Sequence, residues 1–172
     1  MQNKNSFLEL KYFNNFGKIC GYASVFNIED SYNDIILPSA FKNTLLQDGD
    51  IKMLWQHDIT KPIGYFDVIR EDDIGLYIEG QILLNTMEGK NAFELIKTKS
   101  VSGLSIGYFA IDFSYTKDNK RVLKEIELKE ISIVTFPANK HSKITYFKND
   151  HIMEKLDRIE RIFTPQPSQQ FF

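Results

Sequence analysis

The stretch VSGLSIGY, residues 101–108, decides how the rest of the chain is interpreted. It leads into a largely apolar run, 104–113, whose length and composition predict a β-strand. Side chains along a strand alternate between two faces, so Gly103, Ser105 and Gly107 share one face. Ser105 therefore lies between two residues without side chains. Glycines inside a strand mark either a bulge or tight strand crossing, or a place where a ligand backbone comes close, and both alternatives apply here.

The composition predicts one soluble globular domain, with or without a tail. Of the 172 residues, 42% are hydrophobic and 26% are charged, and the chain is long enough to bury a core. A net charge of −2, from 21 basic and 23 acidic residues, gives no electrostatic signal for nucleic acid. The single cysteine, Cys20, excludes an internal disulfide and fits a reducing compartment. A polar N-terminus and the lack of an 18-residue apolar run predict neither a signal peptide nor a membrane span.

Fourteen Phe and eight Tyr, spread over short alternating segments, favour a β-rich fold with eight or nine strands and two helices. Segment 28–36 is polar and is expected to form turns. Ser39 is expected to cap the first helix, and Asn85 or Thr86 the second. The expected strands are 7–12, 18–26, 51–55, 62–69, 76–84, 104–113, 122–136 (one long strand or a bent pair) and 144–147, and the expected helices are 40–47 and 88–99.

The character of the chain changes after Asn149. Apolar residues recur at helical spacing from Ile152 to Phe163, and Pro165 and Pro167 end that pattern. The expected division is therefore a domain at 1–149 and an amphipathic helix with a flexible tail at 150–172. Such a helix could dock on its own domain, bind a partner or be a removable tail.

Three residue types suited to acyl transfer occur in distinctive places. His57 follows the apolar strand 51–55 and precedes Asp58 in a turn, where an imidazole could serve as a general base or simply face solvent. Glu130 shares a strand face with apolar neighbours, so it needs a partner, unless the strand bulges and turns it to water or a lysine pairs with it. The hydroxyl of Ser105 becomes a nucleophile only when a base takes its proton and a third group holds that base.

The chain resembles the prohead maturation protease family of tailed bacteriophages, serine peptidases related in fold to the herpesvirus assembly protease. The resemblance covers roughly residues 17–145 and depends on several short motifs in series rather than on any single one. Where Ser39 stands, the family usually has glycine, which puts the shape of that loop in doubt. The matching motifs, in chain order, are GYASVF (21–26), PSAF (38–41), LWQHD (54–58), PIG (62–64), DIGLY (73–77), GLSIGY (103–108) and EISIVTFPAN (130–139).

Carried over residue by residue, the resemblance implies that Ser105 is the nucleophile, His57 the general base and Glu130 the third catalytic residue. Ser102 is the nearest rival of Ser105, but it lies on the opposite strand face and outside the centre of the motif. The herpesvirus relatives use a second histidine as third residue, which keeps His141 as an alternative, with Asp58 as another. The oxyanion-hole donors stay open between backbone N–H groups near Ser105 and an arginine, Arg70 or Arg121.

The implied fold is α+β and mainly β: a closed or partly open β-barrel with a few flanking helices. The implied function is an endopeptidase of phage capsid maturation, acting inside the immature prohead in the bacterial cytoplasm. Its substrates would be scaffolding protein or the scaffolding segment of the major capsid protein, and it would also cleave itself. A homodimer is possible, and neither nucleic acid, membrane, metal nor organic cofactor is expected. The alternative is a non-catalytic scaffold or binding module with the same fold.

Overall fold

The computed structural model describes residues 17–47 and 50–146 as a curled, mainly β domain with two helices. Its strands are β1 (Lys18–Val25), β2 (Asp34–Ile36), β3 (Lys52–Trp55), β4 (Asp58–Glu71), β5 (Gly75–Ile82), β6 (Gly103–Tyr115), β7 (Arg121–Val134) and β8 (Ile144–Tyr146). The helices are α1 (Lys42–Leu46) and α2 (Met87–Lys97). The expected strand at 7–12 and the expected helix and tail at 150–172 lie outside the described residues.

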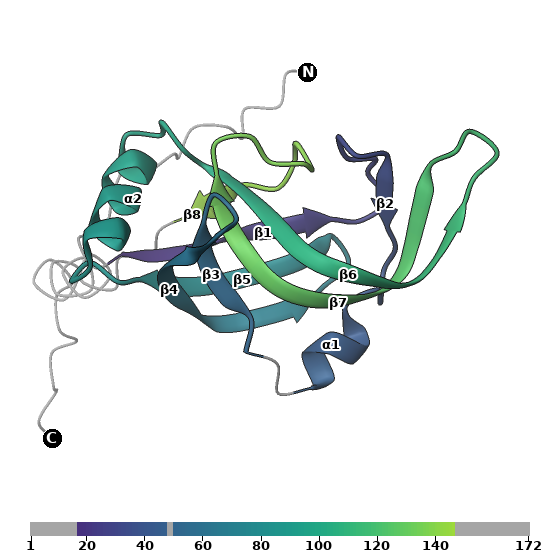
Figure 1. Ribbon diagram of the computed structural model, residues 1–172, viewed down its shortest axis with the longest axis horizontal. Helices are drawn as coiled ribbons and strands as arrows, with labels where there is room; N and C mark the ends of the chain where they lie inside the picture. Colours follow the sequence, from purple (N-terminus) through teal and green to yellow (C-terminus); the bar gives the residue numbers. More distant parts are fainter. Residues whose placement is uncertain (1–16, 48–49, 147–172) are drawn as a thin grey trace, which may run out of the picture.

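The sheet curls into a partly open barrel with the order β2-β7-β3-β4-β5-β1-β8, and β6 pairs with the other edge of β7. Figure 1 shows β6 and β7 crossing over the layer formed by β1, β5 and β4. At its start, β6 also approaches β8, because Gly103 bridges to Lys143 and the amide of Ile144 donates to the carbonyl of Ser102. This arrangement confirms the expected mainly β, barrel-like class.

β7 organises the molecule because it has partners along both edges. β6 runs antiparallel to it from Gly103 to Tyr115, while β2 and β3 pair in parallel with its two ends on the opposite edge. Between the positions paired with β2 and β3, the segment around α1 accepts the hydrogen bonds of β7. The amide of Ile126 donates to the carbonyl of Ala40, and the amide of Leu128 donates to Thr44 Oγ1. Backbone donors that would otherwise be buried without partners are thereby satisfied.

The core fills the inside of the curl. α2 covers one end, with Ala92, Phe93 and Ile96 facing inward, and its first turn is capped by the Thr86 hydroxyl, which accepts from the amide of Gly89. The Thr86 cap agrees with the sequence-based expectation. The largest fully buried side chains include Phe41, Met53, Ile63, Leu76, Ile78, Ile82, Leu104, Leu123, Ile126, Ile131 and Ile133.

Three local expectations were wrong. Segment 28–36 includes β2, because Asp34–Ile36 pair with β7, a contact that depends on residues about ninety positions away. β4 begins at Asp58 and not at 62, so the connection between β3 and β4 is shorter than the sequence indicated. Ser39 does not cap α1: its φ is +72°, the position before the helix is Phe41, and no side chain caps the helix.

The left-handed backbone at Ser39 gives a physical reason for glycine at this position. A residue with a Cβ is disfavoured there by about 1–2 kcal/mol, whereas glycine adopts positive φ readily. Ser39 is also exposed, so its side chain supplies little packing.

We expect the free energy of unfolding of Ser39→Gly to be about 1 kcal/mol higher than that of Ser39→Ala. Both variants lose the hydroxyl, but only glycine adopts the positive φ without strain. Urea denaturation of the two variants and the wild type measures this difference. Equal stability of the glycine and alanine variants would contradict the strained turn.

Candidate active site

His57 lies on a two-residue turn between β3 and β4. Trp55 pairs with Asp58, so Gln56 and His57 form the loop, with φ values of +56° and +60°. A turn of the I′ type requires positive φ at both central residues and matches the twist of a hairpin. His57 thus occupies the turn itself, whereas the sequence placed Asp58 there. Gln56 anchors the turn to the end of β7: its amide donates to the carbonyl of Ile133, and its side-chain Nε2 donates to Thr135 Oγ1 at 2.9 Å.

Glu130, on β7, lies beside this turn and makes two hydrogen bonds. Its Oε1 is 2.5 Å from His57 Nδ1, and its Oε2 accepts from the hydroxyl of Ser132 at 2.7 Å. Ser132 in turn accepts from the backbone amide of His57 at 3.0 Å. The carboxylate is mostly buried, with 12% of its side chain exposed, and these partners offset the cost of burying it.

The contact with Glu130 acts on the protonation of His57. Its hydrogen bond and negative charge raise the pKa of His57 above the usual 6.5, although partial burial works in the opposite direction. When Nδ1–H donates to Glu130, the neutral ring keeps its lone pair on Nε2. The geometry therefore leaves Nε2 as the ring atom that can accept a proton.

Ser132 is the residue that sequence reasoning missed. It is fully buried in the otherwise apolar segment Ile131–Val134, and a buried hydroxyl needs a partner. The sequence contained that signal, a serine within an apolar strand. It did not show which groups the hydroxyl binds, because one of them, the amide of His57, belongs to the distant β3–β4 turn and the other, Glu130, reaches it only through the bulge of β7.

Of the two uses that the sequence left open for the glycines of the opening stretch, the structure shows the structural one, a bulge and a tight approach within the chain. A Cβ at Gly107 would lie 2.9 Å from both Cγ and Cδ of Glu130, and one at Gly103 would lie 2.7 Å from Cδ of Pro137. The pairing of β6 with β7 also shifts after Gly107, which faces Glu130, while Tyr108 faces Leu128. Gly107 therefore makes room for the Glu130 side chain beside a bulge, and Gly103 makes room for Pro137.

That bulge corrects the expected face of Glu130. One residue of β7, Lys129, has no partner on β6, so the alternation between Leu128 and Glu130 is interrupted. Leu128 remains in the core. Glu130 turns toward His57, and neither solvent nor a lysine is its partner.

Ser105 and His57 line the same cavity, which has a volume of about 280 Å³. Ser105 lies on β6 directly opposite Ser132 of β7, and only 7% of it is exposed. The structure thus brings Ser105, His57 and Glu130 into one region through three separate elements. Ser102 precedes β6 and does not line this cavity.

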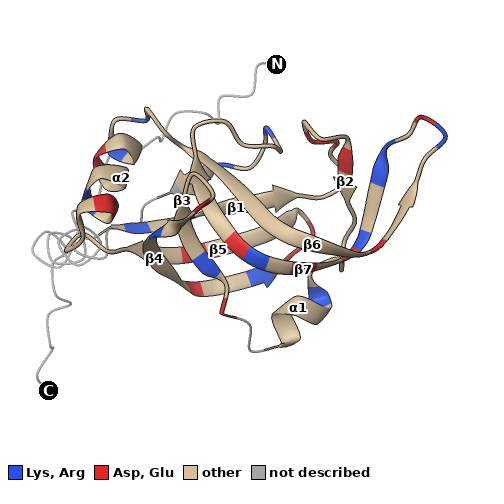
Figure 2. Ribbon diagram, in the orientation of Figure 1, with Lys and Arg blue, Asp and Glu red and all other residues tan. Residues whose placement is uncertain are grey.

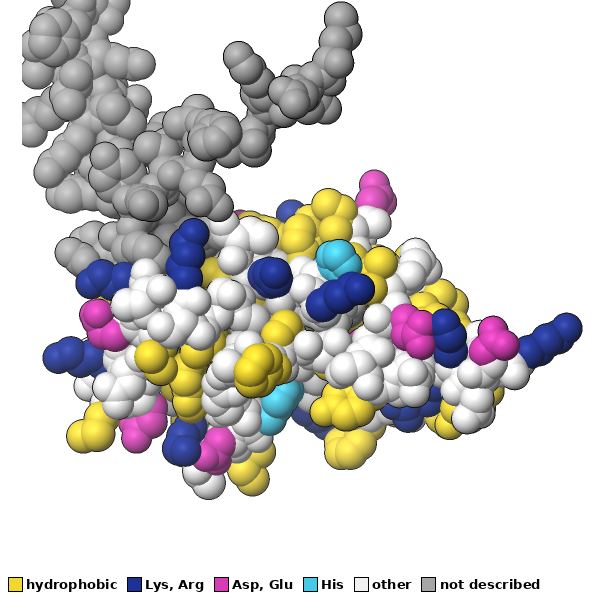
Figure 3. Space-filling view, turned by 90° about the horizontal axis from the view of Figure 1, so that it is seen from above, with side chains coloured by type: hydrophobic (Ala, Val, Ile, Leu, Met, Phe, Trp, Pro, Cys, Tyr) yellow, Lys and Arg dark blue, Asp and Glu magenta, His cyan; other side chains and the backbone are white. Residues whose placement is uncertain are grey.

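The two alternative third residues are engaged elsewhere. Asp58 pairs with Lys61 at 2.8 Å and accepts from Thr60, contacts that lower its pKa to about 2. His141 is exposed, and its backbone amide bonds to Asn139. Figure 3, which views the molecule from above, shows histidine side chains (cyan) in separate places on that face. Of the candidates named from the sequence, Glu130 is the one that contacts His57.

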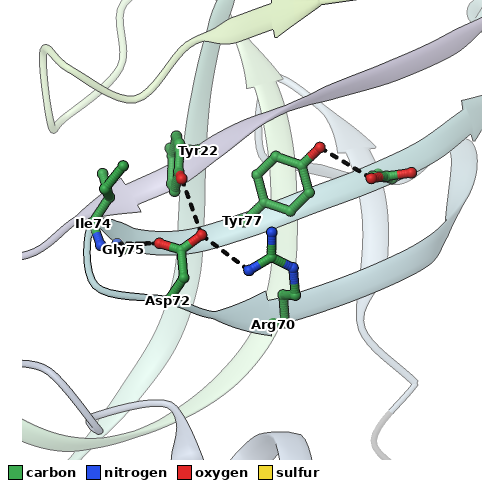
Figure 4. Close-up of polar contacts among 7 residues, drawn as sticks. Tyr22, Arg70, Asp72, Ile74, Gly75 and Tyr77 are labelled. Carbon is green, nitrogen blue, oxygen red and sulfur yellow. Dashed lines mark hydrogen bonds and ion pairs between the residues drawn. The ribbon is translucent and has the colours of Figure 1, made fainter. Parts of the chain in front are cut away.

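The two arginines considered for an oxyanion hole also have other partners. Arg70 pairs with Asp72 at 3.0 Å, near the turn between β4 and β5 (Figure 4). Its guanidinium carbon, Cζ, also lies over the ring of Tyr77, 4.5 Å from the ring centre. Arg121 binds Asp34 through two nitrogens. Neither arginine lines the cavity.

Among residues 17–47 and 50–146, no group of three or more His, Cys, Asp or Glu is placed to hold a metal ion. No helix in the same ranges is long and apolar enough to cross a bilayer.

The fold places this chain in a recognisable class. It superimposes on the bacteriophage T4 capsid assembly protease with a TM-score of 0.54 at 10% identity, over 68% of this chain and 82% of that one. It superimposes on KSHV protease, solved with a hexapeptide phosphonate inhibitor, with a TM-score of 0.54 at 11% identity, over 87% and 77% of the two chains. The fold is therefore that of the herpesvirus proteases.

Sequence comparison gives the family. Residues 7–157 match the Caudovirus prohead serine protease family, and the chain belongs to it. It is 38% identical to the prohead protease of Enterobacteria phage HK97 over 144 residues, 81% of this chain and 64% of that protein. It is 30% identical to the prohead protease of Escherichia phage T5, over 77% of this chain and 63% of that protein. It is also 30% identical to the capsid polyprotein of Pseudomonas phage PAJU2, over 70% of this chain and 18% of the polyprotein. The chain spans slightly less than two thirds of the two prohead proteases.

We expect Glu130→Gln to lower the pKa of His57, because the neutral amide no longer favours the imidazolium. NMR titration of the His57 ring protons measures this pKa. The wild-type pair stabilises the fold fully below pH 6.5 and loses that contribution as pH rises through the raised pKa, so the variant's stability should vary less over this window. Glu127→Gln on the same strand, where Glu127 pairs with Lys129, is the matched control. An unchanged His57 pKa in Glu130→Gln would contradict the coupling.

We expect Gly107→Ala to lower the free energy of unfolding by about 1–3 kcal/mol, because its methyl group meets the Glu130 side chain. In a Glu130→Ala background the same substitution should cost much less, since the obstructing carboxylate is gone. Denaturant unfolding of the two single variants and the double variant closes this cycle. Additive costs would contradict the close fit of Glu130 over Gly107.

Proposed function

We propose that this protein is a serine endopeptidase that cleaves scaffolding protein, or the scaffolding segment of the major capsid protein, during prohead maturation. The observation that carries the proposal is the His57–Glu130 hydrogen bond at the wall of the cavity that Ser105 also lines. Family membership supports the peptidase activity, and the capsid polyprotein relative supports an association with capsid components. Such an enzyme would act within the prohead in the bacterial host.

In the proposed mechanism, Ser105 Oγ attacks the scissile carbonyl carbon while Nε2 of His57 takes the hydroxyl proton. The C–N bond then breaks, and His57 gives this proton to the leaving amine, which leaves an acyl ester on Ser105. Water, deprotonated by the same nitrogen, hydrolyses the ester and restores the serine. Glu130 orients the ring through Nδ1 and stabilises the imidazolium that forms in both steps.

Ser132 has a positioning role in this scheme. It binds both the backbone amide of His57 and the second oxygen of Glu130, so it relates the base and the carboxylate to each other. A hydrogen-bonded group of this kind keeps the catalytic ring in one orientation. Ser132 does not itself meet the substrate.

We expect Ser105→Ala to abolish cleavage of a co-expressed capsid precursor, with a loss of at least about 10³-fold in rate, because no other group would form the acyl ester. Gel electrophoresis and mass spectrometry of the products measure cleavage, and the length of the enzyme itself reports self-cleavage. Ser102→Ala is the matched control and should retain activity, since Ser102 lies outside the cavity.

Two results would contradict this assignment in different ways. Cleavage that survives in Ser105→Ala but disappears in Ser102→Ala would move the nucleophile to Ser102. Absence of cleavage by the wild type within assembled proheads would favour the other candidate, a non-catalytic assembly module with the same fold.

A further inference from the structure

The cavity at Ser105 extends beyond the reacting groups. Its wall includes β1, β2, the loop between them, and the segment that follows β7, so it joins the candidate active site to a second polar region. At about 280 Å³ it corresponds to roughly nine water volumes of about 30 Å³ each, which is room for a long side chain. A peptide whose carbonyl lies at Ser105 could place one neighbouring side chain in it.

The polar region contains two carboxylates, Asp34 and Asp30, that differ in their hydrogen-bond partners. Asp34 is 3% exposed and fully paired: Arg121 donates from Nε at 2.7 Å and from Nη2 at 2.5 Å, and the Tyr108 hydroxyl donates at 2.8 Å. Asp30 receives only backbone donors, from Tyr32 at 2.8 Å and Asp34 at 2.9 Å, and both bind Oδ1. Figure 2 shows the acidic residues at β2 and in the loop before it.

Asp30 therefore has unused capacity. Within the described part of the chain its Oδ2 has no hydrogen-bond partner, and no cation pairs with it. Burial is the largest influence on this carboxyl and raises its pKa above the ordinary value, while the hydrogen bonds from the backbone amides of Asp34 and Tyr32, and to a smaller extent the charge of Arg121, only partly oppose that change. Because Arg121 is already bound to Asp34, the cavity keeps one negative charge without a partner.

Ser24 provides an independent indication that a ligand binds here. It lines the same cavity, is 2% exposed, and its hydroxyl has no hydrogen-bond partner among the described residues. A buried polar group without a partner costs about 1–3 kcal/mol, so a native structure needs a reason to keep one. A ligand that donates a hydrogen bond into the cavity supplies that reason.

Part of the remaining wall is apolar. Ala23, Ile36 and Ile106 line it together with the polar groups. Lysine and arginine bury their methylene stems along apolar surface and end in groups that only donate hydrogen bonds. Such a side chain matches the apolar wall, the free oxygen of Asp30 and the unpaired hydroxyl of Ser24. A glutamate would instead bring a second uncompensated charge beside Asp30, and an aliphatic side chain would leave both polar groups unpaired.

We propose that this cavity is a substrate subsite for a basic side chain adjoining the scissile bond, selected by Asp30 and Ser24. This inference depends on the proposed peptidase function. The loop that carries Asp30 is held from several sides, since Ser31 donates to the carbonyl of Ala138 and Glu29 pairs with Lys120 at 2.6 Å. The subsite is therefore formed before the substrate binds.

The test begins with cleavage of a peptide library by the full chain, with products read by mass spectrometry. We expect lysine or arginine at one fixed position within a few residues of the cleaved bond. Matched peptides carrying lysine, arginine, uncharged norleucine or glutamate at that position then give kcat/KM values. The basic peptides should exceed norleucine at least tenfold, and glutamate should be the poorest.

Two variants identify the residues responsible. Asp30→Asn keeps the Oδ1 acceptor for both backbone amides, and it should lower kcat/KM for the lysine peptide at least tenfold while leaving the norleucine peptide unchanged. Ser24→Ala should lower it severalfold without loss of folding stability, because the hydroxyl has no partner in the free protein. Asp118→Asn, at the tip of the exposed β6–β7 hairpin, is the control and should change neither value.

Wild-type cleavage without a basic preference, or a basic preference that persists in Asp30→Asn, would overturn the subsite and leave the proposed peptidase function intact. Absence of cleavage of every peptide and of the precursor would overturn the proposed function, and the subsite with it.

Discussion

The carboxylate of Glu130 is the constraint on which the site depends. It is mostly buried, and a buried carboxylate is tolerated only when its oxygens have partners. Each oxygen has one, His57 Nδ1 and Ser132 Oγ, and Ser132 also holds the backbone amide of His57. The three groups form a closed ring of hydrogen bonds that fixes which imidazole nitrogen is occupied. The space for this ring comes from Gly107 on the neighbouring strand, where any larger side chain would displace the carboxylate.

β7 explains why such distant residues meet. Its last part carries Glu130 and Ser132 and pairs with β3, which leads directly into the turn of His57. Its other edge pairs with β6 and places Ser105 opposite Ser132. Its first part pairs with β2, and Arg121 there binds Asp34. One strand therefore positions both the candidate catalytic groups and the acidic region of the cavity, so a shift in its register would disturb both.

The sequence predicted the local elements well and the long-range relations poorly. Period-two patterns and the Thr86 cap are local signals, and they placed most strands and α2 within a few residues of the observed ends. β2 was missed because it is a three-residue strand formed only by pairing with β7. The two possible uses of Gly107 could not be distinguished from the sequence for the same reason: a glycine shows that something comes close, but the bulge at Lys129 decides that it is Glu130. Ser132 could be recognised from sequence as a buried hydroxyl but not assigned its partners.

Left-handed backbone occurs in the loops that border the cavity. Gln56 and His57 have positive φ in one wall, and Asn27 and Asn33 have φ values of +57° and +61° on either side of the loop that carries Asp30. Such conformations cost energy and persist only where surrounding contacts hold them. Here those contacts are long-range: Gln56 binds β7, and Ser31 binds Ala138. Because β7 and the segment that follows it hold both walls, His57 and the Asp30 carboxylate keep a fixed relation. A preformed site of this kind favours one chemical class of side chain, since the wall cannot rearrange to satisfy another.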